Sequence, residues 1–420
     1  MLRPTGCLGR PFPSTVPAPM PRSVLLSAAR TPMGAFGGAL ATVPAPALGA
    51  AAIRAALDRA GVAPEQVDEV VMGCVLTSGV GQAPARQAAL GAGLPDSTPC
   101  LTINKVCGSG MKAVMLADQA IRAGDADVIV AGGMENMSLA PFLLDKARYG
   151  YKYGNSTLVD ALFHDGLRDA YDSNPMGVSA DLCAETCNVS REAQDAFSVE
   201  SYTRAQNAST EGRFDAEIAP VTVPGRKGDT VVSRDEGPFT ANFDKMPTLR
   251  GAFTKTGTVT AANASTIDDG AAALVVASED WARDNGKTPL ATIVASAQHA
   301  KAPVEFTTAP SQAVEKVLAK AGLTIDQIDL FEVNEAFAVV ALAAQDALGI
   351  PHEKLNVNGG AVALGHPIGA SGARILTTLV HALAARGGRY GLAAICIGGG
   401  EATAIIVERD TTGDAAGDAA

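Results

Sequence analysis

The chain has 420 residues, of which 47% are hydrophobic, 5% aromatic and 18% charged, and its formal net charge is −11. This length suits two or three domain-sized units around a large buried core. The negative charge argues against nucleic acid as the main partner, and no uninterrupted apolar run is long enough to predict a membrane-spanning helix.

Residues 1–20 contain two arginines, several prolines and no acidic residue. The prolines prevent an amphipathic helix over much of this segment, so we expect a disordered leader. The alternatives are a transit peptide and a start codon assigned too early, with Met20 as the true first residue. The tail at 410–420, rich in Ala, Gly, Asp and Thr, is also expected to be disordered.

The chain contains a diverged internal repeat. Leu57–Asp68 aligns without a gap with Leu318–Asp329, and Cys107-Gly-Ser-Gly110 recurs as Gly369-Ala-Ser-Gly372. Each glycine-containing turn is followed by a helical pattern and then by an apolar strand that ends in glycines. This repeated order predicts an α/β fold with two halves, mainly parallel sheets and a pseudo-twofold axis.

A different kind of segment, at about 139–260, lies between the repeats and is expected to be an inserted lobe. It has several tyrosines, mixed charge and a predicted helix that begins at Arg191 after the N-cap Ser190. Its position suits a substrate-binding cap or an oligomer contact. The expected domains are therefore an N-terminal half at 21–290, which includes the lobe, and a C-terminal half at 291–409.

Cys107 lies where a predicted strand meets a predicted helix. A thiol at a helix N-terminus is favoured as thiolate, and Gly108 and Gly110 are expected to let a substrate approach closely. A buried structural cysteine is the alternative. The repeat favours a reactive role, because the equivalent turn of the second half lies just after His366.

Three further residues lie in similar positions. His366, in a glycine-rich run without charged residues, suits either proton transfer near neutral pH or a plain tight turn. Cys396 ends an apolar strand before Gly398-Gly-Gly400, whose N–H groups suit an oxyanion. Asn334 follows another strand and is also a possible helix N-cap. Two cysteines beside one histidine suit a reaction that holds one substrate as a thioester while another loses a proton from carbon.

The chain has seven irregularly spaced cysteines, and no pair of histidines accompanies Cys183 and Cys187. This pattern favours reduced thiols in a cytoplasmic compartment over disulfides or a zinc site.

These motifs resemble those of the thiolase family, over about residues 21–409. The matching segments are Asn104–Lys112, 257–265, Asn334–Phe337, Asn356–Gly372 and Cys396–Gly400. The resemblance implies the thiolase fold, with two βαβαβαββ halves in five α-β-α-β-α layers and an inserted loop domain. It implies reversible ping-pong condensation of two acetyl-CoA to acetoacetyl-CoA and CoA, with no tightly bound cofactor, by a homo-oligomer (a dimer or tetramer).

The resemblance also assigns roles to the conspicuous residues. Cys107 would be the nucleophile that takes the acyl group, and His366 would activate it. Cys396 would remove the α-proton of the second acetyl-CoA. Asn334 would position a water in the oxyanion hole for the resulting enolate, and the N–H groups of Cys107 and Gly398 would form the second oxyanion hole.

Further residues are implied to contact CoA or an ion beside it. Ser265 would contact the pantetheine, Lys245 would lie near the nucleotide, and Met176 and Phe337 would line the channel. Some family members bind potassium, and the matching positions here are Tyr202, Ala261, Ala262, Ala264 and Val362. Tyr202 would also lie close to the CoA site. Simple packing of the lobe is the alternative for Tyr202.

One departure from the short-chain pattern leaves the substrate range open. Pro175 stands where many short-chain members have histidine, so a broader 3-ketoacyl-CoA thiolase of fatty-acid β-oxidation is the alternative. Two other classes are a ketoacyl synthase of the same fold and an inactive scaffold. Cys396 argues against the synthase, and the presence of all four groups argues against the scaffold.

Overall fold

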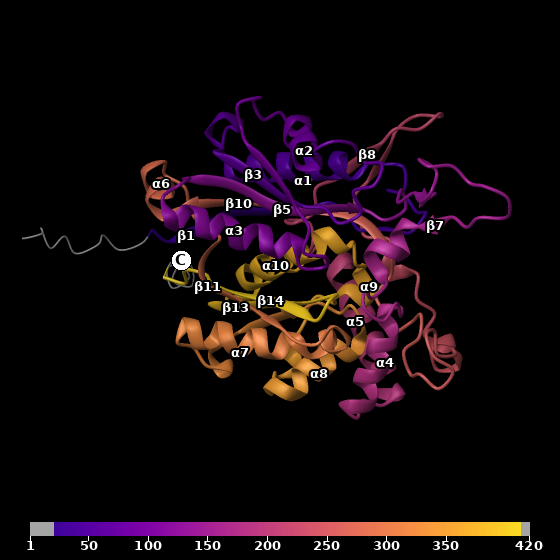
Figure 1. The fold of residues 1–420 in the computed structure, drawn as a ribbon. Coiled ribbons are helices and arrows are strands. Elements are labelled where there is room, and N and C mark those ends of the chain that lie inside the picture. The colour runs from indigo at the N-terminus through magenta and orange to yellow at the C-terminus, as the bar shows by residue number, and fades with distance from the viewer. Residues whose placement is uncertain (1–20, 413–420) are drawn as a thin grey trace, which may run out of the picture.

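The computed structural model describes residues 21–412, so the predicted leader at 1–20 and most of the predicted tail lie outside the described residues. Figure 1 shows five layers, with a pair of helices between two sheets and further helices outside each sheet. The five-layer α-β-α-β-α arrangement predicted from the sequence is confirmed. From one outer layer to the other, the main helices are α1 (Ala45–Ala60) with α2 (Pro84–Ala92), α3 (Ser109–Ala123) with α10 (Ile368–Arg386), and α7 (Ala309–Ala321) with α8 (Ala338–Leu348).

The strands form one continuous path that the two halves share. The N-terminal half contributes, in spatial order, β4 (Cys100–Ile103), β3 (Glu69–Gly73), β5 (Val128–Asn136), β10 (Asp268–Ser278) and β1 (Ser23–Arg30), with β2 (Gly34–Ala35) paired to β10. The C-terminal half contributes β11 (Ala291–Ala300), β14 (Glu401–Glu408), β13 (Tyr390–Ile397) and β12 (Leu330–Val333). Along this path the two halves are joined by a short β1–β11 pairing at Val24↔Thr292 and Leu25↔Ala291.

The prediction of mainly parallel sheets is wrong. β3 is parallel to β4 and β5, and β12 is parallel to β13, but the pairs β1–β10, β10–β5, β11–β14 and β13–β14 are antiparallel. The physical reason is clearest at β13 and β14. Only the turn 398–400 separates them, and Gly399 and Gly400 have φ of 92° and 91°. Such a short connection makes a hairpin, whereas parallel strands need a long crossover.

The two central helices meet through glycines near their N-termini. A Cβ on Gly110 of α3 would lie 2.7 Å from Ala373 N, and a Cβ on Gly372 of α10 would lie 2.5 Å from Met111 N. A Cβ on Gly108 would lie 2.4 Å from Ile397 Cδ1 of β13. Gly108 and Gly110 therefore allow the C-terminal half to pack closely against this turn. This corrects the expectation that they make room for a substrate.

α10 is the most buried of the long helices. It is long and apolar enough to cross a membrane, but 83% of its apolar stretch is buried inside the protein. Figure 1 shows it between the two sheets, where both faces contact protein. Its hydropathy is therefore explained by its position at the centre of the core.

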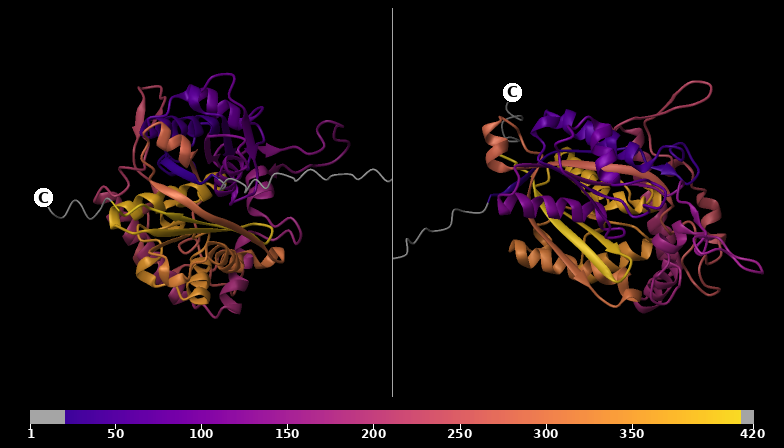
Figure 2. Two further views of the ribbon diagram at one scale, coloured as in Figure 1. Left: turned by 90° about the vertical axis from the view of Figure 1, so that its left-hand side faces the viewer. Right: turned by 45° about the horizontal axis from the view of Figure 1, so that its top comes forward.

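The inserted segment forms a lobe beside the layers. It contains α4 (Met176–Thr186), α5 (Arg191–Thr210) and the short pairs β6 (Phe142–Leu143) with β7 (Val159–Asp160) and β8 (Val221–Val223) with β9 (Thr230–Val232). The predicted N-cap of α5 is confirmed, because Ser190 Oγ accepts a hydrogen bond from Ala193 N at 3.1 Å. Figure 2 shows that the β6–β7 and β8–β9 segments reach away from the layers.

The shorter elements connect these layers. They are α6 (Glu279–Asp284), α9 (Ala361–Leu364), the π-helical turn Leu162–Leu167 and the 3₁₀ turns Pro64–Gln66, Gly237–Phe239, Phe243–Thr248, Pro303–Thr308, Ile325–Gln327 and His352–Lys354. β11 begins at Ala291.

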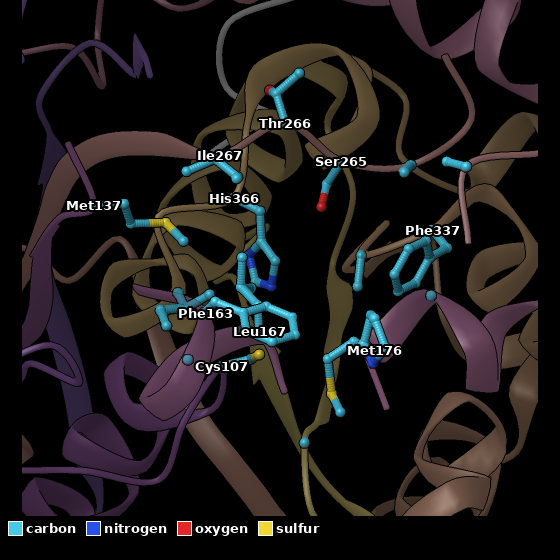
Figure 3. Close-up of a pocket in the computed structure, with 18 of the residues that line it drawn as sticks. Cys107, Met137, Phe163, Leu167, Met176, Ser265, Thr266, Ile267, Phe337 and His366 are labelled. Atoms are coloured by element: carbon cyan, nitrogen blue, oxygen red, sulfur yellow. The ribbon is translucent and has the colours of Figure 1, made fainter. Parts of the chain in front are cut away.

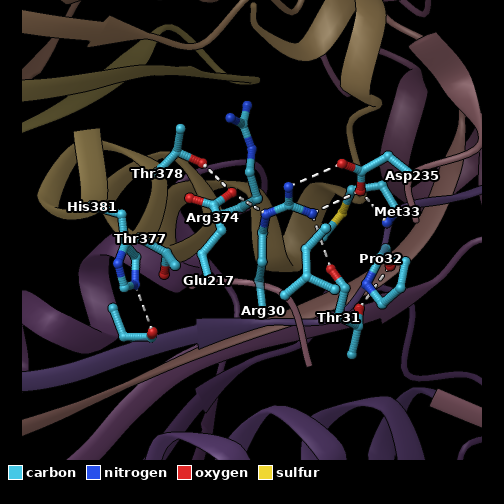
Figure 4. A network of polar contacts seen from close by, with 12 residues as sticks. Arg30, Thr31, Pro32, Met33, Glu217, Asp235, Arg374, Thr377, Thr378 and His381 are labelled. Carbon is cyan, nitrogen blue, oxygen red and sulfur yellow. Dashed lines mark hydrogen bonds and ion pairs between the residues drawn. The ribbon is translucent and has the colours of Figure 1, made fainter. Parts of the chain in front are cut away.

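A buried charge network attaches the lobe to both halves (Figure 4). Arg30 of β1 donates to Asp235 at 2.7 and 2.9 Å and to Glu217 at 2.5 Å. Thr378 of α10 donates to the same Glu217 at 3.2 Å. Because Arg30 is fully buried, removal of either acid would leave its guanidinium with one carboxylate partner instead of two, which would destabilise the core.

Candidate active site

A mostly apolar cavity of about 590 Å³ lies where the two halves and the lobe meet. Figure 3 shows side chains from all three parts around it. The N-terminal half contributes Cys107 and Met137, and the C-terminal half contributes Phe337, His366 and Gly398. The lobe contributes Phe163, Leu167, Met176 and Phe253. A ligand in this cavity therefore contacts parts of the chain that are far apart in sequence.

Cys107 lies on a strained turn between β4 and α3, at the predicted strand-to-helix junction. Val106 has a φ of 45°, which is unfavourable for a β-branched residue. Ser109 Oγ donates to Val106 O at 2.7 Å and accepts from Lys105 N at 2.8 Å, so it closes the turn. This turn presents the Cys107 side chain at the cavity wall.

The protonation of Cys107 differs from the sequence-based expectation. Burial raises the pKa of the thiol to about 11, although the backbone N–H groups of Gly398 and of Cys107 itself lower it. This raised pKa disfavours the thiolate that the position at the helix N-terminus predicts. Desolvation in an apolar cavity outweighs two N–H dipoles.

His366 is fixed from both its backbone and its ring. Its N–H donates to Thr266 O at 3.2 Å and to Asp268 Oδ2 at 3.1 Å. Its Nδ1 lies 2.6 Å from Ser371 Oγ. Its Nε2 has no hydrogen-bond partner within residues 21–412, and the ring lines the cavity. The free nitrogen is therefore available to a substrate or to Cys107.

His366 is neutral near pH 7. Burial and the positive charge of Arg374 lower its pKa to about 3. Arg374 exerts this effect because it is fully buried and its guanidinium nitrogens have no hydrogen-bond partner in the described chain. Its ion pair with Glu332 is long, at 3.7 Å. At neutral pH the resting site therefore contains a neutral thiol and a neutral imidazole.

Cys396 and Asn334 lie behind the cavity wall, at neighbouring strand ends. The parallel pairing Val333↔Ala394 places the carboxyl end of β12 beside that of β13. Cys396 is 1% exposed, and burial, followed by the charge of Cys107, raises its pKa well above the ordinary value. It is two residues from Gly398, which lines the cavity.

Asn334 has an unusual side chain. It is 1% exposed, yet neither Oδ1 nor Nδ2 has a hydrogen-bond partner in the described chain. The N-cap alternative is wrong, because α8 begins at Ala338 after Phe337. Buried amides are nearly always hydrogen-bonded, so a water or a ligand oxygen is the expected partner of this one.

Some of the residues predicted to contact CoA line the cavity, and others do not. Ser265, Met176 and Phe337 line the cavity. Lys245 is exposed in the turn Phe243–Thr248 and does not line the cavity. Tyr202 is buried and packs edge-on against Phe243 at 6.2 Å between ring centroids, also outside the cavity lining.

The residues predicted to hold potassium are chemically suited to that ion. The structure gives Tyr202 Oη no hydrogen bond within residues 21–412, and burial, with the charges of Asp268 and Glu335, raises its pKa to about 12. Asp268 Oδ1 is also buried without a partner in that range. A hydroxyl, backbone carbonyls and a carboxylate are hard oxygen donors. No cluster of three or more His, Cys, Asp or Glu side chains suited to a metal occurs among the described residues.

Several cavity residues were not identified from the sequence. Phe163 and Leu167 lie in the π-helical turn, and Phe36 and Phe253 lie in loops, so no periodic sequence pattern marked these four residues. Ser371, which contacts His366, was also not identified, although the internal repeat aligns it with Ser109. The six cysteines within the described residues are free thiols, whereas Cys7 lies outside them.

Comparisons with known proteins agree with this geometry. Residues 23–280 match the thiolase N-terminal domain, and residues 287–409 match the thiolase C-terminal domain. An acetyl-CoA acetyltransferase of Schizosaccharomyces pombe is 51% identical over 387 residues, which cover 92% of this chain and 98% of the relative. An acetyl-CoA acetyltransferase of Cupriavidus necator is 53% identical over 388 residues, with 92% and 99% covered. Acetyl-CoA acetyltransferase 2 of Arabidopsis thaliana is 53% identical over 392 residues, with 92% and 97% covered.

Proposed function

Because the chain belongs to the thiolase family, we propose that it is an acetyl-CoA C-acetyltransferase. It condenses two acetyl-CoA to acetoacetyl-CoA and CoA, and it cleaves acetoacetyl-CoA in the reverse direction. The observation that carries this function is the cavity in which the Cys107 thiol and the unpartnered Nε2 of neutral His366 both lie, with the second thiol, Cys396, behind Gly398.

The first half-reaction transfers the acetyl group to Cys107. His366 Nε2 takes the thiol proton as the Cys107 sulfur attacks the thioester carbon, so the thiolate forms only during attack. The N–H groups of Cys107 and Gly398 both interact with the sulfur, which places them to donate to the oxygen of the tetrahedral intermediate. The carbon–sulfur bond to CoA then breaks.

Cys396 completes the proton balance. At rest it is a buried thiol with a raised pKa, so it donates its proton to the departing CoA sulfur and becomes a strong base. After CoA leaves, this thiolate takes the α-proton of the second acetyl-CoA. The carbanion attacks the acetyl carbon on Cys107, and the imidazolium of His366 returns its proton to the released Cys107 sulfur. Each proton that leaves one group is accepted by another.

Asn334 is proposed to stabilise the enolate of the second half-reaction. Its amide has unused donor and acceptor capacity next to the strand end that carries Cys396. A water held by this amide would donate to the enolate oxygen. Preorganised donors of this kind are typically worth about 10²–10³ in rate.

Short-chain preference is tested by thiolysis of acetoacetyl-, 2-methylacetoacetyl- and 3-ketohexanoyl-CoA. We expect kcat/KM to be highest for one of the two acetoacetyl thioesters. A higher value for 3-ketohexanoyl-CoA would instead favour the broad-range enzyme of fatty-acid β-oxidation. The relatives named above are all called acetyl-CoA acetyltransferases, so the short-chain reading is the better supported.

A potassium ion is proposed beside the cavity, held by Tyr202 Oη and the carbonyls of Ala261, Ala262, Ala264 and Val362. Within residues 21–412, Tyr202 Oη has no hydrogen-bond partner and neither has the buried Asp268 Oδ1, and both observations support this site. The ion would order the loop at 261–266, which includes Ser265. Assays in potassium and in sodium are expected to differ for the native protein and to agree for Tyr202→Phe.

The remaining CoA contacts and the assembly are also proposals. Lys245, as an exposed cation, would attract the CoA phosphates, so Lys245→Ala is expected to raise the KM for CoA a few-fold and to leave kcat unchanged.

A homo-oligomer, a dimer or tetramer, is supported by the exposed edge strand β4, where Leu101 is 44% exposed, and by the exposed aromatics at 142–153. Light scattering tests this assembly. A cytoplasmic location is consistent with the free thiols.

A further inference from the structure

Ser371 is the only side chain within the described residues that contacts the His366 ring through a hydrogen bond. It lies in the first turn of α10 and is fully buried. Its Oγ lies 2.6 Å from His366 Nδ1 and 2.9 Å from Pro367 O. The hydroxyl therefore connects the imidazole to the backbone of its own helix.

These two contacts favour a proton on one of the two ring nitrogens. A serine hydroxyl has one proton to donate and lone pairs to accept. Pro367 O can only accept, so the hydroxyl proton points to this carbonyl. Ser371 Oγ then accepts from His366, which requires a proton on Nδ1. In a neutral imidazole, Nε2 is consequently left without a proton, and Nε2 is the atom without a partner at the cavity.

The N-terminal half contains the same device. Ser109 is the repeat equivalent of Ser371, and its Oγ also donates to a carbonyl, that of Val106, while it accepts from an N–H, that of Lys105. In one half this serine fixes the backbone turn of Cys107, and in the other it fixes the ring of His366. Because the same arrangement of the serine hydroxyl occurs in both halves, chance does not explain the contact between Ser371 and His366.

We propose that Ser371 is a positioning residue that holds neutral His366 in the Nδ1–H form, so that Nε2 is the base for Cys107. This rests on the proposed function, because it assumes that His366 accepts the Cys107 proton. Without the Ser371 acceptor, Nδ1–H would be buried without a partner, which is unfavourable. The ring would then shift toward the Nε2–H form, which cannot accept a proton from Cys107.

The native protein gives the first test, which needs no variant. Nitrogen NMR of ¹⁵N-histidine-labelled protein reports the tautomer of each of the five histidines, and His366→Asn identifies the His366 signals. We expect a protonated Nδ1 and a bare Nε2 at pH 7. An Nε2–H tautomer in the native protein would overturn the proposal.

Variants give the second test. Ser371→Ala is expected to slow acetylation of Cys107 by about 10–100-fold, as loss of an orienting hydrogen bond commonly does, with little change in KM. Ser371→Thr retains the hydroxyl and is expected to restore most of the rate. The rate is measured as the burst of CoA released from acetyl-CoA.

The matched control is Thr377→Val in the same helix. Thr377 is also fully buried and its Oγ1 makes the same type of bond, to Ala373 O at 2.9 Å, but it does not contact His366. Its burst rate should stay within about twofold of the native value. Equal losses in Thr377→Val and Ser371→Ala would reduce Ser371 to a structural residue. A native protein that forms no acetyl-Cys107 at all would instead refute the proposed function.

Discussion

The turns that carry Cys107 and His366 occupy equivalent places in the two halves, but they are held differently. Cys107 follows a residue with positive φ and projects into the cavity from a turn that the side chains of Asn104 and Ser109 stabilise. His366 is 6% exposed and is held by Thr266, Asp268 and Ser371. One turn presents a reacting atom, and the other fixes the direction of a lone pair.

This difference shows how a duplicated turn can serve two chemical roles. A nucleophile must reach the substrate and change its bonding, so it is placed at the cavity surface. A base must stay oriented and must be unprotonated before the attack, and burial beside Arg374 keeps His366 neutral at rest. The predictions below test whether the two turns divide the chemistry in this way.

The largest effect is expected for Cys107→Ser. A serine hydroxyl is a much poorer nucleophile without a matched base, so thiolysis of acetoacetyl-CoA should fall by about 10⁴-fold or more. Mass spectrometry after incubation with acetyl-CoA should find no acetyl group on the protein. An acetyl group on another residue would refute the assignment of Cys107.

The second prediction concerns the resting protonation state. Because the pKa of Cys107 is raised to about 11 and that of His366 is lowered to about 3, the thiolate fraction should rise tenfold per pH unit. Alkylation of the Cys107 peptide by iodoacetamide should thus accelerate about 10³-fold between about pH 6 and pH 9. A plateau below about pH 8 would indicate a thiolate–imidazolium pair instead.

The third prediction separates the two half-reactions. Asn334→Ala removes the unpartnered amide at the end of β12. Condensation should slow by about 10²-fold, because an enolate stabiliser is lost, while the burst of CoA from acetyl-CoA should change little. An equal loss in both half-reactions would place Asn334 in the acylation step.

The smallest effect on chemistry, but a clear effect on folding, is expected for Gly110→Ala. The added methyl would meet Ala373 N of the other half at 2.7 Å, and overpacking of this kind costs about 1–3 kcal/mol of unfolding free energy. Gly91→Ala in α2 is the control, since its methyl would meet only Ala50 Cβ, at 3.2 Å. Urea unfolding measures both; equal stabilities would contradict the close contact of α3 and α10.

The repeat allowed the two halves and the convergence of the Cys107 and His366 turns to be predicted from sequence, and the resemblance to thiolases implied the five layers. It did not reveal strand direction, because hairpin pairing depends on how short the 398–400 turn is. It also did not reveal protonation: helix position favours a thiolate at Cys107, and only the apolar side chains brought in from distant segments reverse this. Gly110 illustrates the same limit, since its partner Ala373 is defined only by the tertiary fold.

The division of labour between the two cysteines is tested most directly with Cys396→Ala. The protein is incubated with acetyl-CoA in deuterated water, and both the acetylated peptide and the deuterium content of acetyl-CoA are measured by mass spectrometry. We predict that the acetyl group is found on Cys107 in the variant, as in the native protein, and that only the native protein incorporates deuterium at the α-carbon. Undiminished deuterium incorporation by the variant, or native acetylation at Cys396, would contradict the account.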